Sequence, residues 1–181
     1  MSGQRLHPTV VVKEASPNVS ERSTAISLIV LHSTESANLA GSGDLAGVAA
    51  WFANPASQVS AHVIADADGR SARCVPDHAK AWACVDFNSA SLNIEQIGRA
   101  AQQHWSRREW LETARWIAQF SHEHHIPIRR AVVSGNRVIR SGVTTHEALG
   151  AAGGGHHDPG PGYPLEEVLH EARRIKRLRY G

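Results

Sequence analysis

The alternation of apolar and polar positions along the chain first indicates two strands. Residues 26–31 (ISLIVL) form a short, mostly apolar and partly β-branched run, which is typical of a strand buried on both faces. Residues 92–95 (LNIE) instead alternate between apolar and polar positions. This period of two predicts a strand with one polar face, on which Glu95 points away from Ile94.

A β-hairpin is predicted between these two strands. Residues 59–65 and 70–75 are strand-like runs that flank the tetrapeptide DADG at 66–69. We expect Asp68 and Gly69 to supply the positive φ angles that a tight hairpin turn requires.

Three amphipathic helices are predicted from apolar residues that recur three and four positions apart. The first starts at Asp44, and the third has Pro164 in its first turn. The second starts at Ser106, where Ser106 and Glu109 match the S-x-x-E pattern of a capping box. Four tryptophans at or near helical positions are expected to pack in the core: Trp51, Trp105, Trp110 and Trp116.

Strands and helices intermingle along the chain without a strict βαβ repeat. This order predicts an α/β fold, a single domain with a central mixed β-sheet flanked by helices. With 181 residues, one domain buries roughly 70% of the surface that its unfolded chain exposes. The sequence shows no internal repeat, low-complexity tail or interdomain linker.

Charge and cysteine content exclude several classes of protein. The net charge of +2 is too small to predict a nucleic-acid partner. No apolar run approaches the length of a membrane span, and the first thirty residues lack the pattern of a signal peptide, so neither membrane insertion nor export is predicted. The two cysteines, Cys74 and Cys84, form no metal-binding pair by their spacing and are either free thiols or one bridge.

Histidine is the unusual residue, with twelve in the chain, which favours chemistry built on imidazole. A catalytic zinc needs three protein ligands and one open position. Three separated points can supply them: His32 at a strand end, His146 in TTHEAL, and Asp158 in HHDPGPGYP. Each signal alone is weak, because a single histidine after a strand is more often a core residue, and TTHE can also open a helical turn with Thr145 as its cap.

The succession of motifs is more specific than any one of them. The motifs are V-L-H-S-T, S-A-H-V-I, S-L-N-I-E, T-T-H-E-A-L and H-H-D-P-G-P-G-Y-P. This order resembles the type 2 N-acetylmuramoyl-L-alanine amidases, a zinc amidase fold shared by phage lysozymes of the amidase kind, bacterial amidases and peptidoglycan recognition proteins. The resemblance implies a zinc amidase catalytic domain at residues 24–181, preceded by an N-terminal extension at residues 1–23.

The resemblance also implies roles for five residues. His32 and His146 match the two zinc histidines of the family, and Asp158 matches the third ligand, so one Zn²⁺ per chain is expected. Glu95 stands at the place of the catalytic glutamate in the family strand S-I-G-I-E. His156 stands where many members carry a lysine that faces the reacting carbonyl, and it is predicted as a second catalytic residue.

Substrate contacts are predicted at Trp82 and Thr34, although for Trp82 a place in the core is an equally good interpretation. At two further positions the chain lacks a side chain that family members carry. Ala83 replaces a histidine of the family motif A-W-H-A-G, and Ala61 replaces a tyrosine that is catalytic in some members. His62 is expected to be structural, with its side chain bonded inside the sheet.

The expected function is hydrolysis of the amide between the lactyl group of muramic acid and L-alanine in peptidoglycan. The chain resembles the catalytic domain of a phage endolysin, made in the host cytoplasm and acting on the cell wall after release at lysis. A monomer suffices for this role. Two alternatives stay open: a non-catalytic peptidoglycan receptor of the same fold, and a zinc peptidase that cuts within the stem peptide.

Overall fold

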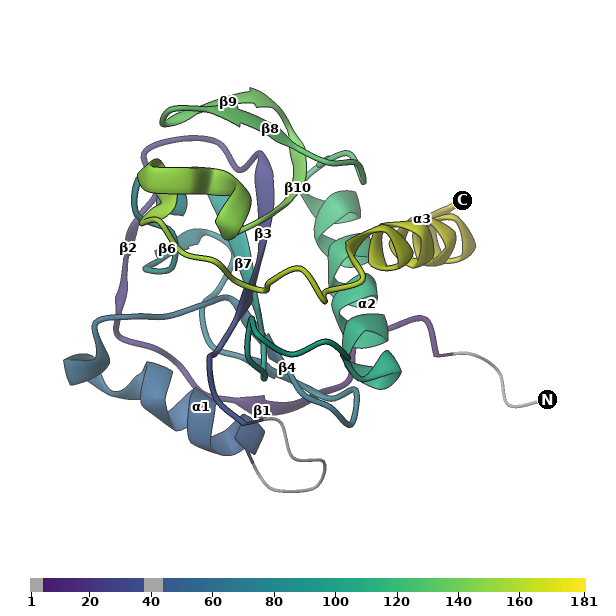
Figure 1. The fold of residues 1–181 in the computed structure, drawn as a ribbon, viewed down its shortest axis with the longest axis horizontal. Coiled ribbons are helices and arrows are strands. Elements are labelled where there is room, and N and C mark those ends of the chain that lie inside the picture. The colour runs from purple at the N-terminus through teal and green to yellow at the C-terminus, as the bar shows by residue number, and fades with distance from the viewer. Residues whose placement is uncertain (1–4, 38–43) are drawn as a thin grey trace.

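A six-stranded mixed sheet forms the centre of the computed structural model, which describes residues 5–37 and 44–181 (Figure 1). The strand order is β1-β5-β4-β7-β3-β10. The bounds of these strands are Val10–Lys13 (β1), Leu28–Ser33 (β3), Val63–Ala65 (β4), Ser71–Arg73 (β5), Ser91–Gln96 (β7) and Gly142–Thr145 (β10). The predicted α/β class, a single domain with a central mixed sheet flanked by helices, is confirmed.

The remaining elements surround this sheet. Two small antiparallel pairs are β2 (Val19–Glu21) with β6 (Ala79–Ala81), and β8 (Val132–Ser134) with β9 (Arg137–Arg140). The helices are α1 (Asp44–Ala53), α2 (Arg107–Glu123) and α3 (Leu165–Tyr180). The short 3₁₀ segments are η1 (Pro55–Ser57), η2 (Val85–Ala90) and η3 (Glu147–Gly153). None of the described helices is long and apolar enough to cross a membrane.

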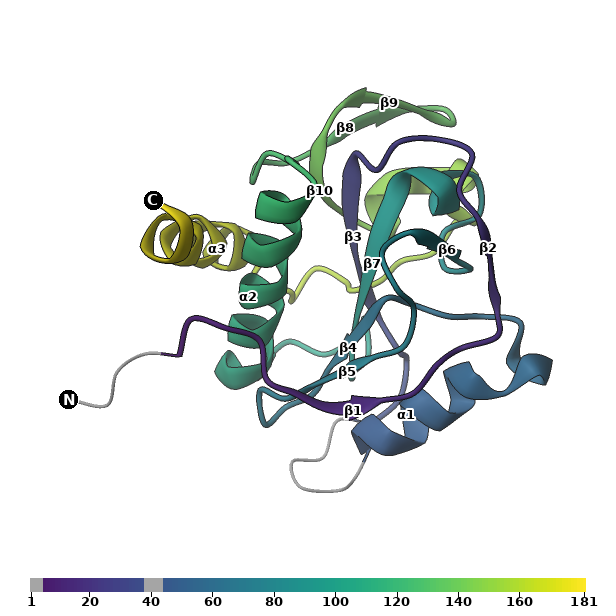
Figure 2. The ribbon, with the colours of Figure 1, turned by 180° about the vertical axis from the view of Figure 1, so that it is seen from behind.

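The two faces of the sheet are covered by different helices (Figures 1 and 2). Ile29 and Leu31 of β3 belong to the cluster that packs against α2 and α3. Leu28 and Val30, on the other face, pack against η2 and η3, and α1 covers that same face near β4 and β5. All four residues have no exposed surface, and full burial of each contributes roughly 1.5–3 kcal/mol. The prediction of a strand buried on both faces is therefore confirmed.

Parallel pairing brings the ends of three strands together. Both β7 and β10 pair with β3 in parallel, so their carboxyl ends lie at the same edge of the sheet. In folds with parallel strands, this edge is the usual place for a ligand site.

The predicted helices are present, with one local correction. The first starts at Asp44 and the third follows Pro164 directly, as expected. Ser106 occupies the N-cap position of α2 but makes no capping hydrogen bond. Its hydroxyl donates instead to the carbonyl of Ala67 at 2.6 Å, and Glu109 is fully buried. The predicted capping box is therefore wrong, because the Ser106 hydroxyl bonds to Ala67 instead of to the first turn of α2.

The predicted hairpin is confirmed, since β4 and β5 pair in antiparallel fashion. Within the turn at residues 66–69, Gly69 alone has a positive φ angle, +73°, so the expectation for Asp68 is wrong. The turn is organised instead by the carboxylate of Asp66, whose Oδ1 accepts hydrogen bonds from the amides of Asp68 and Arg70. This carboxylate satisfies the amides of the turn, so a second left-handed residue is not required.

Several features differ from the sequence-based expectation. The segment predicted as an N-terminal extension, residues 1–23, contains β1 and β2, and β1 joins the edge of the central sheet. Residues 142–145 form β10, and the helical turn that TTHE can open follows as η3. Trp51 is 54% exposed, so its predicted place in the core is wrong. Of the other three tryptophans, Trp105 and Trp116 are buried in the core, and Trp110 packs against it.

Candidate metal centre and adjoining cavity

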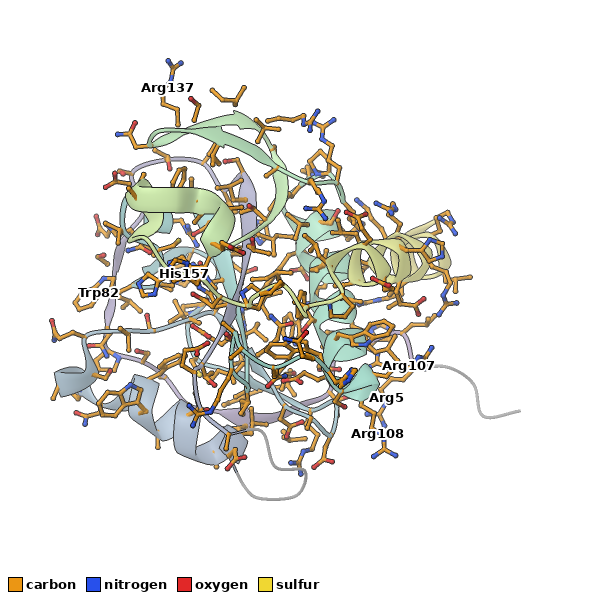
Figure 3. All side chains as sticks on the ribbon, in the orientation of Figure 1. Arg5, Trp82, Arg107, Arg108, Arg137 and His157 are labelled. Atoms are coloured by element: carbon orange, nitrogen blue, oxygen red, sulfur yellow. The ribbon has the colours of Figure 1, made fainter. Side chains whose placement is uncertain are left out.

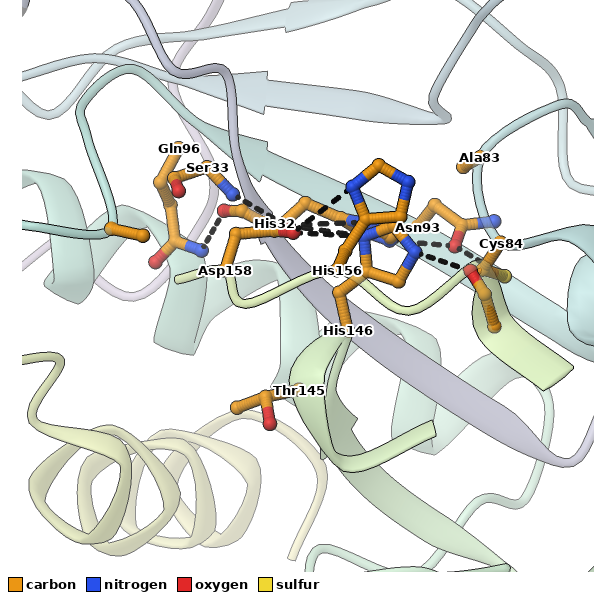
Figure 4. Close-up of polar contacts among 12 residues, drawn as sticks. His32, Ser33, Ala83, Cys84, Asn93, Gln96, Thr145, His146, His156 and Asp158 are labelled. Carbon is orange, nitrogen blue, oxygen red and sulfur yellow. Dashed lines mark hydrogen bonds and ion pairs between the residues drawn. The ribbon is translucent and has the colours of Figure 1, made fainter. Parts of the chain in front are cut away.

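The carboxyl edge of the sheet brings together the three side chains that were predicted as metal ligands (Figure 4). His32 lies near the end of β3, and His146 follows β10 directly. The amide of His146 donates to the carbonyl of Leu31 at 3.0 Å, which continues the parallel ladder beyond β10. Because side chains alternate along a strand, both histidines lie on the sheet face opposite α2 and α3.

Asp158 reaches this pair from the glycine- and proline-rich loop. Its carbonyl accepts the amide of Glu147 at 3.0 Å, and its Oδ2 accepts the amide of Ser33 at 3.1 Å. Beyond it, Gly160 has a φ angle of +83°, and a Cβ there would lie 1.9 Å from the carbonyl oxygen of Ala100. Glycine is therefore required at this position, because the loop passes close to the segment that contains Ala100 as it brings Asp158 back to the histidines.

The distances among the three groups fit a tetrahedral metal ion. The Nδ1 atoms of His32 and His146 are 3.0 Å apart. Oδ2 of Asp158 lies 3.3 Å from Nδ1 of His146 and 3.6 Å from Nδ1 of His32. Zinc bonds of 2.0–2.1 Å in tetrahedral geometry place neighbouring ligand atoms about 3.3 Å apart. The three donor atoms therefore have the spacing of one face of a zinc tetrahedron.

The outer nitrogens of both rings are bonded to acceptors. Nε2 of His32 lies 2.9 Å from Oδ1 of Asn93, and Nε2 of His146 lies 2.8 Å from the carbonyl of Gly153. A carbonyl oxygen only accepts, so each Nε2 donates a proton to its acceptor, and the other ring nitrogen, Nδ1, faces the cluster in both residues. If both Nδ1 atoms, which lie 3.0 Å apart, carry lone pairs beside the carboxylate, these lone pairs repel one another. The arrangement therefore requires a cation among them, either a proton or a metal ion.

Local electrostatics favour the protonation states that a metal ligand needs. Burial lowers the pKa of His32 and the neighbouring His146 lowers it further, although Asp158 opposes both effects. Burial raises the pKa of Asp158, but hydrogen bonds and charge from His146 and His32 outweigh it and hold that pKa below its usual range. A neutral imidazole and an ionised carboxylate are the forms that bind zinc.

Glu95 lies beside the cluster without belonging to it. It is paired in register with His32 across β7 and β3, and it lines the same cavity. Its Oε2 is buried and has no hydrogen-bond partner among the described residues. Burial raises the pKa of Glu95 well above its ordinary value, and the negative charges of Asp158 and Glu35 add to the effect. A cation held by the cluster acts in the opposite direction and favours the ionised form.

A cavity of about 460 Å³ opens from the cluster toward α1. Both residues predicted to bind substrate, Thr34 and Trp82, line it, together with Val48 and the exposed Trp51 of α1. The indole of Trp82 is partly exposed and donates from Nε1 to the hydroxyl of Ser20 at 3.0 Å. This bond leaves an aromatic face at the cavity wall, so a place in the core does not describe Trp82.

The two neighbouring histidines of the loop differ in position. His156 stacks on His146, with ring centroids 4.2 Å apart and an angle of 17° between the rings. Its side chain is 58% exposed and lines the cavity, with Nδ1 3.9 Å from Asp158. His157 is exposed and is not among the residues that line this cavity. In the view of Figure 3, His157 and Trp82 lie between η3 and α1.

Residues behind the cluster have structural roles. His62 is fully buried and its Nδ1 accepts the amide of Asn93 at 3.0 Å. Burial and the charges of Arg22 and Arg73 lower the pKa of His62 to about 3, so it is a neutral part of the sheet interior. Sequence reasoning missed Asn93 and the Gly153 carbonyl, because their contacts with the histidines depend on strand register and on the path of η3.

Within residues 5–37 and 44–181, no other group of polar side chains forms a comparable site. Cys74 and Cys84 are both buried free thiols. Asp77, Glu123 and His124 form a second cluster of potential ligand atoms. Asp77 is already bonded to Arg73 and to His124 there, and the guanidinium repels an added cation.

A family model and a curated relative both match parts of this chain. Residues 22–161 match the model of the family described as N-acetylmuramoyl-L-alanine amidase. This range contains the predicted ligands His32, His146 and Asp158, and also Glu95 and His156. The chain is 36% identical over 94 residues to N-acetylmuramoyl-L-alanine amidase A of Achromobacter lyticus, an alignment that covers 51% of this chain and 49% of that protein. The match thus spans about half the length of this curated relative.

Solved structures share the fold. The hydrolase AmiA of Staphylococcus aureus, solved in complex with its ligand, aligns with a TM-score of 0.70 and 17% identity, covering 96% of this chain and 87% of that chain. The endolysin amidase LysCS of Clostridium intestinale aligns with a TM-score of 0.63 and 14% identity, covering 92% and 97% of the two chains. At these identities the likeness concerns the fold.

Proposed function

The chain belongs to the N-acetylmuramoyl-L-alanine amidase family, and from this premise we propose that it is a zinc-dependent hydrolase of peptidoglycan. The bond it cuts is the amide between the lactyl group of muramic acid and the first L-alanine of the stem peptide. The observation that carries the proposal is the pair of Nδ1 atoms of His32 and His146, which face each other at 3.0 Å beside the carboxylate of Asp158.

The donor set supports zinc in particular. Two imidazole nitrogens and one carboxylate oxygen are a known ligand set for catalytic zinc, and such a set leaves the fourth position open to a water molecule or substrate. When bound, the ion supplies Lewis-acid polarisation of the scissile carbonyl and of the attacking water. His32, His146 and Asp158 would hold it at the base of the cavity.

Glu95 is the proposed general base. Its buried Oε2 has no hydrogen-bond partner among the described residues, so it is available to accept a proton from the attacking water. The same carboxyl then delivers this proton to the leaving amino group of L-alanine. Proton transfer of this kind accelerates hydrolysis by about 10²- to 10⁴-fold.

His156 and the cavity wall complete the proposed site. His156 stacks on His146 and stays accessible from the cavity, so its ring can donate a hydrogen bond to the oxyanion that forms at the reacting carbonyl. Trp82 offers an aromatic face to a sugar ring, and Thr34 offers a hydroxyl group to the substrate.

A biological setting follows from the same proposal. We assign the chain to a phage endolysin, with support from its likeness in fold to the endolysin LysCS. It would be made in the host cytoplasm, reach the cell wall at lysis and act there as a monomer, with no nucleic-acid partner and no membrane insertion.

Product analysis tests the reaction directly. Purified peptidoglycan is incubated with the zinc-loaded protein, with the chelated protein, and with His146→Ala as a matched inactive control. Mass spectrometry should show intact stem peptides with a free L-alanine amino terminus from the zinc-loaded protein alone. Peptides cut internally would identify a peptidase, and binding to the wall without any product would identify a receptor.

A further inference from the structure

Asn93 lies directly behind the proposed metal centre and contacts one of its histidines (Figure 4). It belongs to β7, has no exposed surface, and is followed two residues later by Glu95 on the same face of the sheet. Its Oδ1 lies 2.9 Å from Nε2 of His32. The family strand S-I-G-I-E has glycine at this position, so the side chain is a departure of this chain from that motif.

Two neighbouring side chains form hydrogen bonds with the Asn93 amide. Its Nδ2 donates to the hydroxyl of Ser91 at 3.0 Å, and the thiol of Cys84 donates to its Oδ1 at 3.3 Å. Burial raises the pKa of Cys84 to about 12, so the thiol keeps the proton that it donates. In this arrangement the oxygen of the amide faces His32, and the nitrogen faces the Ser91 hydroxyl.

We propose that Asn93 is a positioning residue that selects the metal-binding tautomer of His32, with Cys84 and Ser91 holding its amide in place. The inference rests on the proposed function in one respect, that the cluster binds zinc. An acceptor at Nε2 retains the ring proton there and presents the Nδ1 lone pair to the cluster. A donor or an apolar group at the same place frees the proton to move to Nδ1, where it blocks coordination.

The two histidines are oriented by different kinds of group. His146 donates to a main-chain carbonyl, that of Gly153, which no side-chain substitution removes. His32 relies on a side chain, so its orientation is the one that mutation can test.

The test compares Asn93→Leu with Asn93→Asp. Leucine is close to asparagine in size but accepts no hydrogen bond, so the affinity for Zn²⁺ should fall about 10- to 100-fold. Aspartate retains the acceptor and should keep the affinity near that of the wild type. Affinity is measured by competition with a chromophoric chelator. Asn93→Ala replaces the leucine variant if the latter does not fold.

Gln96→Leu is the matched control on the opposite face of the same strand. Gln96 is also buried and donates to the main-chain carbonyl of His32 at 2.9 Å, so this variant loses a buried hydrogen bond without touching the imidazole. Its zinc affinity should stay near that of the wild type. An equal loss in Gln96→Leu and Asn93→Leu, or no loss in Asn93→Leu, would overturn the inference.

The tautomer is also observable in the metal-free protein. The ¹⁵N shifts of the His32 ring should report a proton on Nε2 in the wild type and a shift of population toward Nδ1–H in Asn93→Leu. An unchanged tautomer in the variant would contradict the inference even if affinity fell. A wild type that shows the Nε2–H form but binds no zinc would instead count against the proposed function, so the two failures are distinguishable.

Discussion

Replacement of Glu95 by glutamine separates proton transfer from metal binding. Glutamine has nearly the same shape but cannot accept the proton of an attacking water molecule. The residue lies beside His32 in the strand register and is not one of the three clustered ligands. We therefore expect Glu95→Gln to bind zinc like the wild type while losing nearly all hydrolysis.

The size of the loss follows from the proposed role. General-base catalysis contributes about 10²- to 10⁴-fold to a rate, which corresponds to roughly 2.7–5.5 kcal/mol of transition-state stabilisation. The turnover number should fall by that factor. The Michaelis constant should change little, because the carboxyl acts on the water rather than on substrate binding.

The same substitution should stabilise the metal-free protein. Burial raises the pKa of Glu95 above its ordinary value, with Asp158 and Glu35 adding to the effect. The ionised carboxyl therefore opposes folding increasingly as the pH rises from the unfolded pKa to the folded pKa, and constantly above it. Each pKa unit of elevation is worth about 1.4 kcal/mol. A neutral amide avoids this penalty at neutral pH.

Three measurements check this prediction: release of L-alanine amino termini from purified peptidoglycan, zinc content by elemental analysis, and thermal unfolding of the metal-free protein. Glu167→Gln on the exposed face of α3 makes the same chemical change far from the site and should leave all three unchanged. Residual turnover above about a tenth of the wild-type value would remove Glu95 from the mechanism. Lost zinc or a lower melting temperature would contradict the electrostatic account.

The remaining predictions concern the other groups around the cavity. His156→Ala should lower the turnover number by up to about 10²-fold with full zinc content, since the ring donates only to the oxyanion; a normal turnover number in steady-state kinetics would exclude that role. Trp82→Ala should raise the Michaelis constant roughly fivefold to tenfold through the loss of an aromatic stacking surface. A lower turnover number with an unchanged Michaelis constant would count against stacking. Protein at a free zinc concentration 1,000 times the dissociation constant should have a free energy of unfolding about 4 kcal/mol higher than protein stripped of zinc by a chelator. Thermal denaturation of the two samples checks this, and equal melting temperatures would be inconsistent with a bound ion.

Much of the fold could be predicted because its elements have strong local patterns. The run at residues 26–31 is apolar on both faces, and β3 is indeed buried on both sides. The apolar stripe that follows Pro164 likewise gives α3, with Val168 and Leu169 buried. In contrast, β10 has only the four residues GVTT, too few to show a period. Its strand character comes from pairing with β3, which the local sequence does not encode.

The candidate site shows the same division. The polar face that includes Glu95 follows from alternation along its strand. No local pattern shows that the loop carrying Asp158 returns to the histidines, since this depends on the close approach of Gly160 to Ala100. That convergence could be predicted only through the family resemblance. The contact of Asn93 with His32 depends on the register between β3 and β7, which becomes visible only in the folded chain.

The zinc content of the purified protein tests the central claim most directly. After dialysis against metal-free buffer, elemental analysis should find one zinc per chain in the wild type and a marked deficit in Asp158→Ala, which keeps both histidines but lacks the third ligand. A wild type without zinc, or an aspartate variant that retains it fully, would contradict the assignment of His32, His146 and Asp158 as a single metal centre.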